Sequence, residues 1–284
     1  MKVLMFGQTG QVATEVLRRH PETQALGKED ADLMDPGACA AQIAAADVDV
    51  IVNAAAYTAV DQAEEEPDLA YTINADAPGA MAQAAAARGI PFLHISTDYV
   101  FDGSASRPWE EDDPTAPLGA YGRSKLAGEE AVRQAGGPHV ILRTAWVHAA
   151  HGKNFVRTML KVGATREQLT VVDDQIGGPT AAGDIAGALL QIAQAFIAGR
   201  GVSGTYHYCG QPIVSWCGFA RAIFETARMT TQVTAIPSSD WPTPAPRPAN
   251  SALNCAKIGR DYGIVQPDWR ISLTQIVKEL ETAP

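Results

Sequence analysis

The chain has 284 residues, of which 46% are apolar and 19% charged, a composition typical of a folded globular protein rather than a disordered one. Its 22 basic and 32 acidic residues give a formal net charge of −10. This charge argues against nucleic acid and anionic membranes as partners, although a few local cations could still bind a small anion. With no recognisable signal peptide and no apolar run of about 18 residues, we expect a cytoplasmic protein.

Short apolar segments alternate with helical segments over the first 146 residues. Strands are expected at 3–6, 24–26, 48–52, 92–96 and 140–143, with helices between them at 11–19, 36–46, 68–88 and 121–134. Short runs of apolar residues are typical of strands that are buried on both faces. The alternation indicates repeated βαβ units and a parallel sheet. The sequence therefore predicts a doubly wound, Rossmann-type α/β domain over 1–146.

The pattern is less regular after residue 146. We expect helices at 154–161, 180–198 and 215–227, strands at 169–172 and 205–208, and a last helix capped by Ser272 that ends near residue 282. The segment 237–248 carries five prolines, so it is either a disordered linker or an ordered loop against a ligand. We expect 167–197 to return to the first domain. A smaller C-terminal substrate domain would comprise 198–284 together with 147–166.

A glycine motif follows the first expected strand. The segment 7–13 reads Gly-Gln-Thr-Gly-Gln-Val-Ala and lies between a strand and a helix. In this context the G-x-x-G-x-x-A spacing predicts a dinucleotide site, because Gly10 lets the backbone approach a pyrophosphate and the helix N-terminus offers free N–H groups. An ordinary glycine turn is the alternative. In open α/β sheets ligands bind beyond the carboxyl ends of the strands, so 54–58, 96–100 and 143–147 are further candidate segments.

Tyr121 and Lys125 are four residues apart, on one face of an expected helix. A neighbouring ammonium stabilises a tyrosinate, so we expect Lys125 to lower the pKa of Tyr121 toward neutrality and to make it a usable proton donor or acceptor. Ser96 or Thr97, near the end of a strand, would supply the hydroxyl that such a pair needs. The alternative is a solvated pair on a helix surface.

Together these segments resemble the extended short-chain dehydrogenase/reductases, and more specifically the dTDP-4-dehydrorhamnose reductase family. The similarity covers essentially the whole chain, and its more specific segments are 53–64, 96–101, 143–147, 174–180 and 242–251. It implies NAD(P)H-dependent reduction of the C4 ketone of dTDP-4-dehydro-L-rhamnose to dTDP-L-rhamnose in deoxysugar biosynthesis. The alternatives are another nucleotide-sugar epimerase or dehydratase of the extended family, or a non-catalytic regulatory subunit that keeps the fold.

The resemblance also implies roles for single residues. The catalytic set would be Thr97, Tyr121 and Lys125. The cofactor would be bound by Gly7, Gly10, Gln11, Val12, Asp32, Leu33, Ala56, Tyr57 and Thr58 together with Tyr121 and Lys125. The dTDP-sugar would contact Thr97, Asp98, Trp146, Arg247 and Asn250. Trp146 could instead belong to the core and Asp98 could cap a turn, whereas an arginine in a proline-rich loop suits a diphosphate.

Two features leave the cofactors open. Gly27 stands where many relatives carry an acid for the ribose hydroxyls, and Lys28 follows it. We therefore expect NADPH to be accepted at least as well as NADH. Some relatives form a homodimer through Mg²⁺ held by three acids, for which Glu15, Asp184 and Glu279 are the candidates here. Three ordinary surface carboxylates are the alternative.

Overall fold

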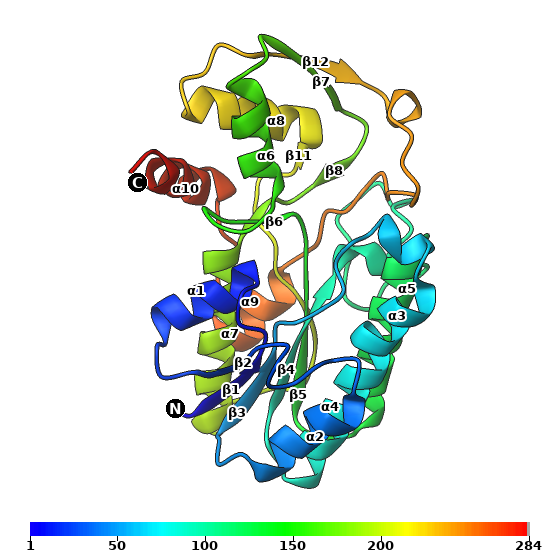
Figure 1. Ribbon diagram of the computed structural model, residues 1–284, viewed down its shortest axis with the longest axis vertical. Helices are drawn as coiled ribbons and strands as arrows, with labels where there is room; N and C mark the ends of the chain where they lie inside the picture. The colour runs from blue at the N-terminus through cyan, green and yellow to red at the C-terminus, as the bar shows by residue number, and fades with distance from the viewer. Residues whose placement is uncertain (283–284) are drawn as a thin grey trace.

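A six-stranded parallel sheet forms the centre of the computed structural model, which describes residues 1–282 (Figure 1). Its strands run in the order β10-β5-β4-β3-β1-β2, and every neighbouring pair is parallel. Their bounds are β1 Val3–Phe6, β2 Gln24–Leu26, β3 Val50–Asn53, β4 Phe92–Thr97, β5 His139–Thr144 and β10 Gly204–His207. The predicted Rossmann-type α/β fold with a doubly wound sheet is confirmed.

Helices cover both faces of this sheet (Figure 1). One face carries α1 Gln11–Arg19, α7 Ala182–Ile197 and α9 Ala256–Tyr262, and the other carries α2 Pro36–Ala45, α4 Ala77–Ala87 and α5 Ala120–Gln134. Alternate residues of β1 enter the two cores: Val3 and Met5 pack on the α1 side, Leu4 and Phe6 on the α2 side. Within the described residues, no helix is long and apolar enough to cross a membrane.

The long helix expected over 68–88 is interrupted. The structure has α3 Pro67–Tyr71, a π-helical turn η2 Thr72–Asp76, and then α4. The turn places Asn74, which is fully buried, against the loop after β3. Its side-chain amide donates to the Tyr57 carbonyl at 3.0 Å and to the Ser124 hydroxyl at 3.0 Å, and its oxygen accepts from the Tyr57 N–H at 2.9 Å. A long-range contact thus accompanies the break in the helix.

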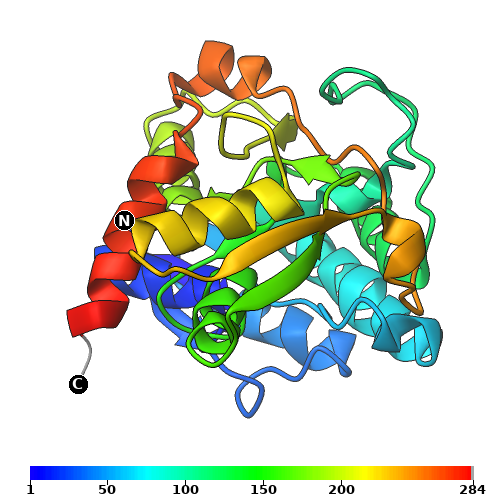
Figure 2. The same ribbon diagram turned by 90° about the horizontal axis from the view of Figure 1, so that it is seen from above.

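The remaining elements lie together at one end of the sheet (Figures 1 and 2). They are the helices α6 Phe155–Gly163, α8 Trp216–Thr226 and α10 Trp269–Thr282, and the strand pairs β7 Gln168–Val172 with β12 Gln232–Ile236, β8 Ile176–Gly177 with β11 Val214–Ser215, and β6 Val147–His148 with β9 Thr180–Ala181. Val156, Phe219, Trp269 and Leu273 belong to a core of their own. The chain enters this part from the carboxyl end of β5 through β6.

One expectation for the C-terminal half, the cap of the last helix, needs revision. The last helix begins at Trp269, so Ser272 does not cap it; the Ser272 hydroxyl instead donates to the Asp184 carboxylate at 2.7 Å. The strand β10 belongs to the central sheet, although it lies within 198–284. In turn, β7 lies within 167–197 but pairs with β12 outside that sheet. The limits of a separate substrate domain stay a prediction.

Candidate active site

The strand order reverses at β1, which has β2 on one side and β3 on the other. The loop after β1 begins with Gly7, whose φ of 108° lies in the region that favours glycine. A Cβ atom on Gly7 would lie 3.2 Å from the Ala54 carbonyl carbon in the loop after β3. The Gly7 N–H donates to the Leu26 carbonyl at 2.9 Å. The two loops that flank the reversal are therefore packed backbone against backbone, which requires glycine.

The helix α1 begins at this loop with an open N-terminus. Gly10 is its N-cap, and no side chain from residues 1–282 caps the first turn. The N–H groups of a first helical turn have no partners within the helix, so this end attracts an anion. The Val12 side chain is buried in the core and the Gln11 side-chain oxygen accepts from Asn154 at 2.9 Å. The geometry fits the pyrophosphate of a dinucleotide, contacted mainly by backbone.

The other expected cofactor residues lie on the loops after β2 and β3, on either side of this helix end. Tyr57 is held by Asn74 and by a hydrogen bond of 2.8 Å from its hydroxyl to Glu66; Ala56 and Thr58 are its neighbours. After β2, the Lys28 ammonium lies 3.7 Å from the Asp32 carboxylate, beside Leu33. The structure therefore brings the expected cofactor segments to one edge of the sheet.

The three expected catalytic residues lie at the same edge. Thr97 ends β4, and α5, which packs on β4, carries Tyr121 and Lys125 in its first turns. Gly122 contacts the Tyr99 carbonyl so closely that a Cβ atom would collide with it. The Lys125 side chain is buried and its ammonium donates to the Ile95 carbonyl at 2.7 Å. The helix is therefore held against the strand end where Thr97 lies.

The charge state of the Tyr121 and Lys125 pair differs from the expectation. Burial raises the pKa of Tyr121 to about 12, and a hydrogen-bonding contact with Thr97 opposes this only in part. Burial lowers the pKa of Lys125 to about 8, against the opposing charge of Glu129. The expected lowering of the Tyr121 pKa by Lys125 is wrong for this structure, because burial dominates and the ammonium is directed to the Ile95 carbonyl. Tyr121 holds its proton at neutral pH.

Asp98 lies directly beside Thr97 and is only 4% exposed. The Thr97 hydroxyl donates to one Asp98 oxygen at 2.9 Å and accepts from the Tyr99 N–H at 3.2 Å, so Thr97 rather than Asp98 caps this turn. Burial raises the pKa of Asp98 to about 6. Its second carboxyl oxygen has no hydrogen-bond partner in the described part of the chain. That oxygen suits a hydroxyl of a bound sugar.

Trp146 and Arg247 are both held by contacts far along the chain. Trp146 has a φ of 49° and stacks on Trp216, with 3.5 Å between ring centroids and 6° between planes. Arg247 forms a two-fold ion pair with Asp61, with both N–O distances at 2.9 Å. The proline-rich segment that carries Arg247 is therefore an ordered loop against the β3 side of the sheet. Of its two interpretations, the disordered linker is wrong.

The Asn250 side chain is held by backbone groups on two other segments, and its expected contact with substrate stays a prediction. Its side-chain amide donates to the carbonyls of Ala105 and Arg107 at 2.8 and 2.9 Å. Its side-chain oxygen accepts from the Ala252 N–H at 2.9 Å, and the residue is 6% exposed. Both amide hydrogens are thus engaged with backbone, and the side-chain oxygen accepts one backbone N–H with one of its two lone pairs.

The three acids proposed for Mg²⁺ do not gather into one cluster within residues 1–282. The Glu15 carboxylate accepts from Arg18 at 2.9 Å and from Arg19 at 2.7 Å, and Arg18 also lies 2.9 Å from Glu279. Asp184 accepts from the Ser272 hydroxyl. Among residues 1–282 no group of three potential ligands could hold a metal ion. Within one chain the Arg18 guanidinium stands between Glu15 and Glu279, and nothing in the part of the chain that the structure describes supports Mg²⁺.

Sequence reasoning missed several buried polar residues around the site. Asn53 and His94 are fully buried beneath Lys125, and Glu129 pairs with Arg143 one helical turn further on. Asp61, the partner of Arg247, was also not assigned. A usable signal existed for His94, because a polar side chain in the apolar run Phe92–Ile95 must find a partner when it is buried.

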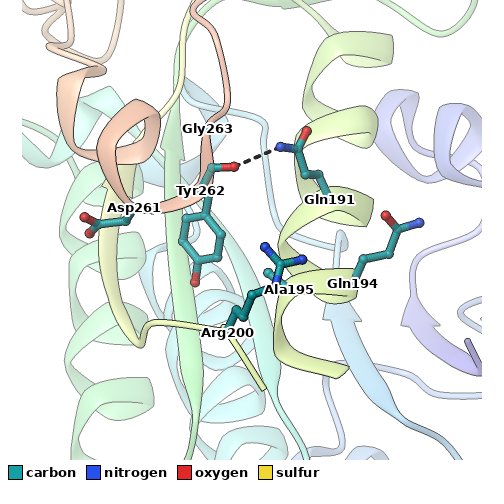
Figure 3. Close-up of a pocket in the computed structure, with 7 residues that line it drawn as sticks. All are labelled: Gln191, Gln194, Ala195, Arg200, Asp261, Tyr262 and Gly263. Atoms are coloured by element: carbon teal, nitrogen blue, oxygen red, sulfur yellow. Dashed lines mark hydrogen bonds between the residues drawn. The ribbon is translucent and has the colours of Figure 1, made fainter. Parts of the chain in front are cut away.

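A separate hollow lies between the second half of α7 and the end of α9 (Figure 3). Gln191, Arg200 and Tyr262 contribute to its lining, and the Gln191 amide donates to the Tyr262 carbonyl at 2.9 Å. None of the expected cofactor or catalytic residues lines it.

Comparisons with known proteins agree with this site. A family model described as RmlD substrate binding domain matches residues 1–282. The dTDP-4-dehydrorhamnose reductase of Sinorhizobium fredii (strain NBRC 101917 / NGR234) is 42% identical, over 98% of this chain and 97% of its own. The crystal structure of a dTDP-4-dehydrorhamnose reductase from Clostridium acetobutylicum ATCC 824 has a TM-score of 0.92 at 36% identity, covering 99% of this chain and 100% of its own.

A further solved structure adds a bound nucleotide. The dTDP-4-dehydrorhamnose reductase of Bacillus anthracis str. Ames, solved in complex with NADP, has a TM-score of 0.92 at 33% identity and covers 98% of this chain and 99% of its own. Since the family model spans nearly the whole chain, and a relative above 40% identity covers it from end to end, this chain belongs to the RmlD substrate binding domain family of dTDP-4-dehydrorhamnose reductases.

Proposed function

We propose that this protein uses NADPH to reduce the C4 ketone of dTDP-4-dehydro-L-rhamnose to dTDP-L-rhamnose. The observation that carries the proposal is the position of Tyr121 and Lys125 beside Thr97, at the sheet edge that also holds the Gly7 loop. Relatives that match over the full chain are named for this reaction. Family membership favours it over epimerisation or dehydration, and the intact catalytic set favours it over a regulatory subunit.

The fit to NADPH rests on the two loops at the strand reversal. The Gly7 loop and the N-terminus of α1 would hold the pyrophosphate, and Lys125 would reach the nicotinamide ribose. Gly27 has no carboxylate that could accept from a ribose hydroxyl. The nearby Asp30 carboxylate already accepts from the Gly27 N–H at 3.0 Å. The adjacent Lys28 is exposed and suits a 2′-phosphate. When bound, NADPH supplies the hydride.

Tyr121 is the acid of the proposed reaction. As the ketone becomes an alkoxide, its oxygen needs a proton from a group that still holds one at neutral pH. Tyr121 meets this requirement because it is protonated at neutral pH, although the rise of its pKa to about 12 makes it a weaker acid than an exposed tyrosine. Thr97 can donate a second hydrogen bond to the same oxygen once its hydroxyl turns away from Asp98, since a hydroxyl has a single proton to donate.

Recognition of the dTDP group falls to the C-terminal part. A diphosphate is repelled by a chain of net charge −10, so a local cation has to compensate. Arg247 supplies one, and the diphosphate would share or replace its contact with Asp61. Trp146 and the free oxygen of Asp98 would contact the sugar nucleotide. We propose the elements around α6, α8 and α10, with the loop of Arg247, as the substrate domain.

The decisive experiment replaces the Tyr121 hydroxyl. Tyr121→Phe should lower kcat by about two to four orders of magnitude, the usual range for general acid catalysis, with NADPH affinity nearly unchanged. Lys125→Met should impair both kcat and NADPH binding. Tyr71→Phe is the matched control, because Tyr71 is 49% exposed on α3. Near-normal kcat in Tyr121→Phe means that another group is the acid.

The assay follows oxidation of NADPH on mixing with dTDP-4-dehydro-L-rhamnose. An epimerase would interconvert sugars without net oxidation, and a regulatory subunit would bind without turnover. Parallel measurements with NADH compare the two cofactors directly. A tenfold preference for NADH, about 1.4 kcal/mol, would show that Glu29 or Asp30 binds the ribose hydroxyls after all.

A homodimer and a cytoplasmic location stay predictions.

A further inference from the structure

A chain of polar side chains runs beneath the proposed active site. Asn53 of β3 and His94 of β4 are paired in register, and both are 0% exposed. The Asn53 amide nitrogen lies 3.1 Å from His94 Nδ1, and His94 Nε2 lies 3.3 Å from Lys125 Nζ. These hydrogen-bonded side chains thus connect the interior of the sheet to the ammonium of Lys125, a residue with a proposed catalytic role.

The contacts of Asn53 determine which His94 nitrogen carries the proton. The Asn53 side-chain oxygen accepts from the Ala55 N–H at 3.2 Å, so its NH₂ group faces His94 Nδ1. An NH₂ group only donates, so Nδ1 must accept and carries no proton. Burial together with the charge of Lys125 keeps the pKa of His94 well below its usual value, so the ring is neutral. Its single proton is therefore on Nε2, the atom that faces Lys125.

This tautomer has a consequence for the protonation of Lys125. An ammonium has three donors and no acceptor, so it cannot bond to an Nε2–H group. A neutral amine has a lone pair that can accept from Nε2–H, and it can still donate to the Ile95 carbonyl at 2.7 Å. The contact with His94 therefore favours the neutral form of Lys125 over the charged one.

We propose that His94, held by Asn53 with its proton on Nε2, is a positioning residue that makes Lys125 release its proton more readily. The proposal deepens the proposed function, in which Tyr121 gives one proton to each product molecule. The tyrosinate must regain that proton. Lys125 can supply it once its ammonium turns from the Ile95 carbonyl toward the tyrosinate: a Lys125 N–H bond breaks, a Tyr121 O–H bond forms, and the resulting amine accepts from His94 until a hydronium ion from solvent restores the ammonium.

Other charged groups around α5 do not account for this effect. On α5 itself, Glu129 favours the charged form of Lys125. Its carboxylate is paired with Arg143 of β5 at 2.7 Å and with Arg133 at 3.2 Å. Burial acts in the same direction as His94 and lowers the pKa of Lys125 to about 8. A test therefore has to change the hydrogen bond while keeping the site buried.

Two variants reverse the hydrogen bond in different ways. His94→Gln presents an amide that can turn its oxygen toward Lys125, which stabilises the ammonium. Asn53→Asp offers a carboxylate that accepts from His94 Nδ1–H, which moves the ring proton and leaves Nε2 as an acceptor. In each variant we expect the pKa of Lys125 to rise by about one unit or more, since a charge-assisted hydrogen bond contributes about 1.5–3 kcal/mol.

The measurement is an NMR titration of ¹³C-lysine-labelled, cofactor-free protein, with Lys125→Met to assign the signal and the other lysines as internal controls. Nitrogen shifts of ¹⁵N-histidine in the unmodified protein, assigned to His94 through correlations with its own backbone, report the tautomer even if a variant fails to fold. A proton on Nδ1, or an unchanged Lys125 pKa in a folded His94→Gln variant, overturns the proposal. Neither readout needs turnover, so failure of the proposed reductase activity is a separate result. In an active enzyme the alkaline limb of the kcat/KM profile should also move to higher pH in His94→Gln.

Discussion

A buried ion pair fastens the proposed catalytic helix to the sheet. Glu129 of α5 is 0% exposed and accepts from Arg143 Nε at 2.8 Å and from Nη2 at 2.7 Å. It also accepts from the Ser96 hydroxyl at 2.6 Å. Glu129 lies four residues after Lys125, so the pair holds the helix face on which the proposed catalytic residues stand. Its loss should therefore affect both stability and activity.

The substitution Glu129→Gln keeps the shape of the side chain and removes its charge. It leaves the Arg143 side chain, only 3% exposed, without its buried counter-ion. Removing one partner of a buried pair typically destabilises a protein by about 3–5 kcal/mol. For a chain of this size each kcal/mol lowers Tm by about 2–4 °C. We therefore expect Tm to fall by about 6–20 °C.

The assay is thermal and urea unfolding followed by circular dichroism. Glu130→Gln is the matched control, because Glu130 is the next residue on α5 and is exposed. It should leave Tm nearly unchanged, since exposed charges contribute little. If Glu129→Gln loses no more stability than Glu130→Gln, the desolvation of the two charges offsets their attraction and the pair does not stabilise the helix.

Three further outcomes are expected. Arg247→Ala should raise KM for the dTDP-sugar by about 10- to 100-fold, because a charge-assisted contact is lost, and should change kcat much less in steady-state assays. An unchanged KM would mean that Arg247 does not bind the substrate. Gly7→Ala should lower the free energy of unfolding measured in urea by about 1–2 kcal/mol, because a φ of 108° is strained for any residue with a side chain. It should also weaken NADPH binding in a fluorescence titration. Gly187→Ala in α7, where nothing lies within 4 Å, should be neutral or stabilising. Burial raises the pKa of Asp98 from 3.8 to about 6. Between these two values the folded protein keeps a proton that the unfolded chain has lost, so the free energy of unfolding falls as pH rises from about 4 to 6. In paired urea titrations, the free energy of unfolding of Asp98→Asn should therefore exceed that of the wild type by on the order of 3 kcal/mol at pH 8 and by little at pH 4. An equal difference at both pH values would contradict the burial of a charge.

Local signals in the sequence were sufficient for most of the sheet and for some helix ends. Asp35 caps α2 by accepting from the Ala38 N–H at 2.9 Å, and Ser215 caps α8 through the Gly218 N–H at 2.9 Å. Both caps depend on residues three apart, so sequence spacing can show them. Ser272 belongs to a preferred capping type but bonds to Asp184, 88 residues away. A residue type alone therefore does not fix where a helix begins: α10 starts at Trp269, three residues before Ser272, and the Asp268 carboxylate accepts from the Arg270 N–H at 3.0 Å.

The proposed site shows the same limit more sharply, because its residue types were identifiable but their hydrogen-bond partners were not. The spacing of Tyr121 and Lys125 predicted a shared helix face, yet it could not show that the ammonium bonds to the Ile95 carbonyl, 30 residues away. That long-range contact, and burial, decide the two pKa values, and they reverse the expected sign for Tyr121. Arg247 likewise pairs with Asp61 across 186 residues. Sequence spacing thus predicts which side chains can meet on one element, whereas their charge and direction depend on partners that the fold brings from other elements.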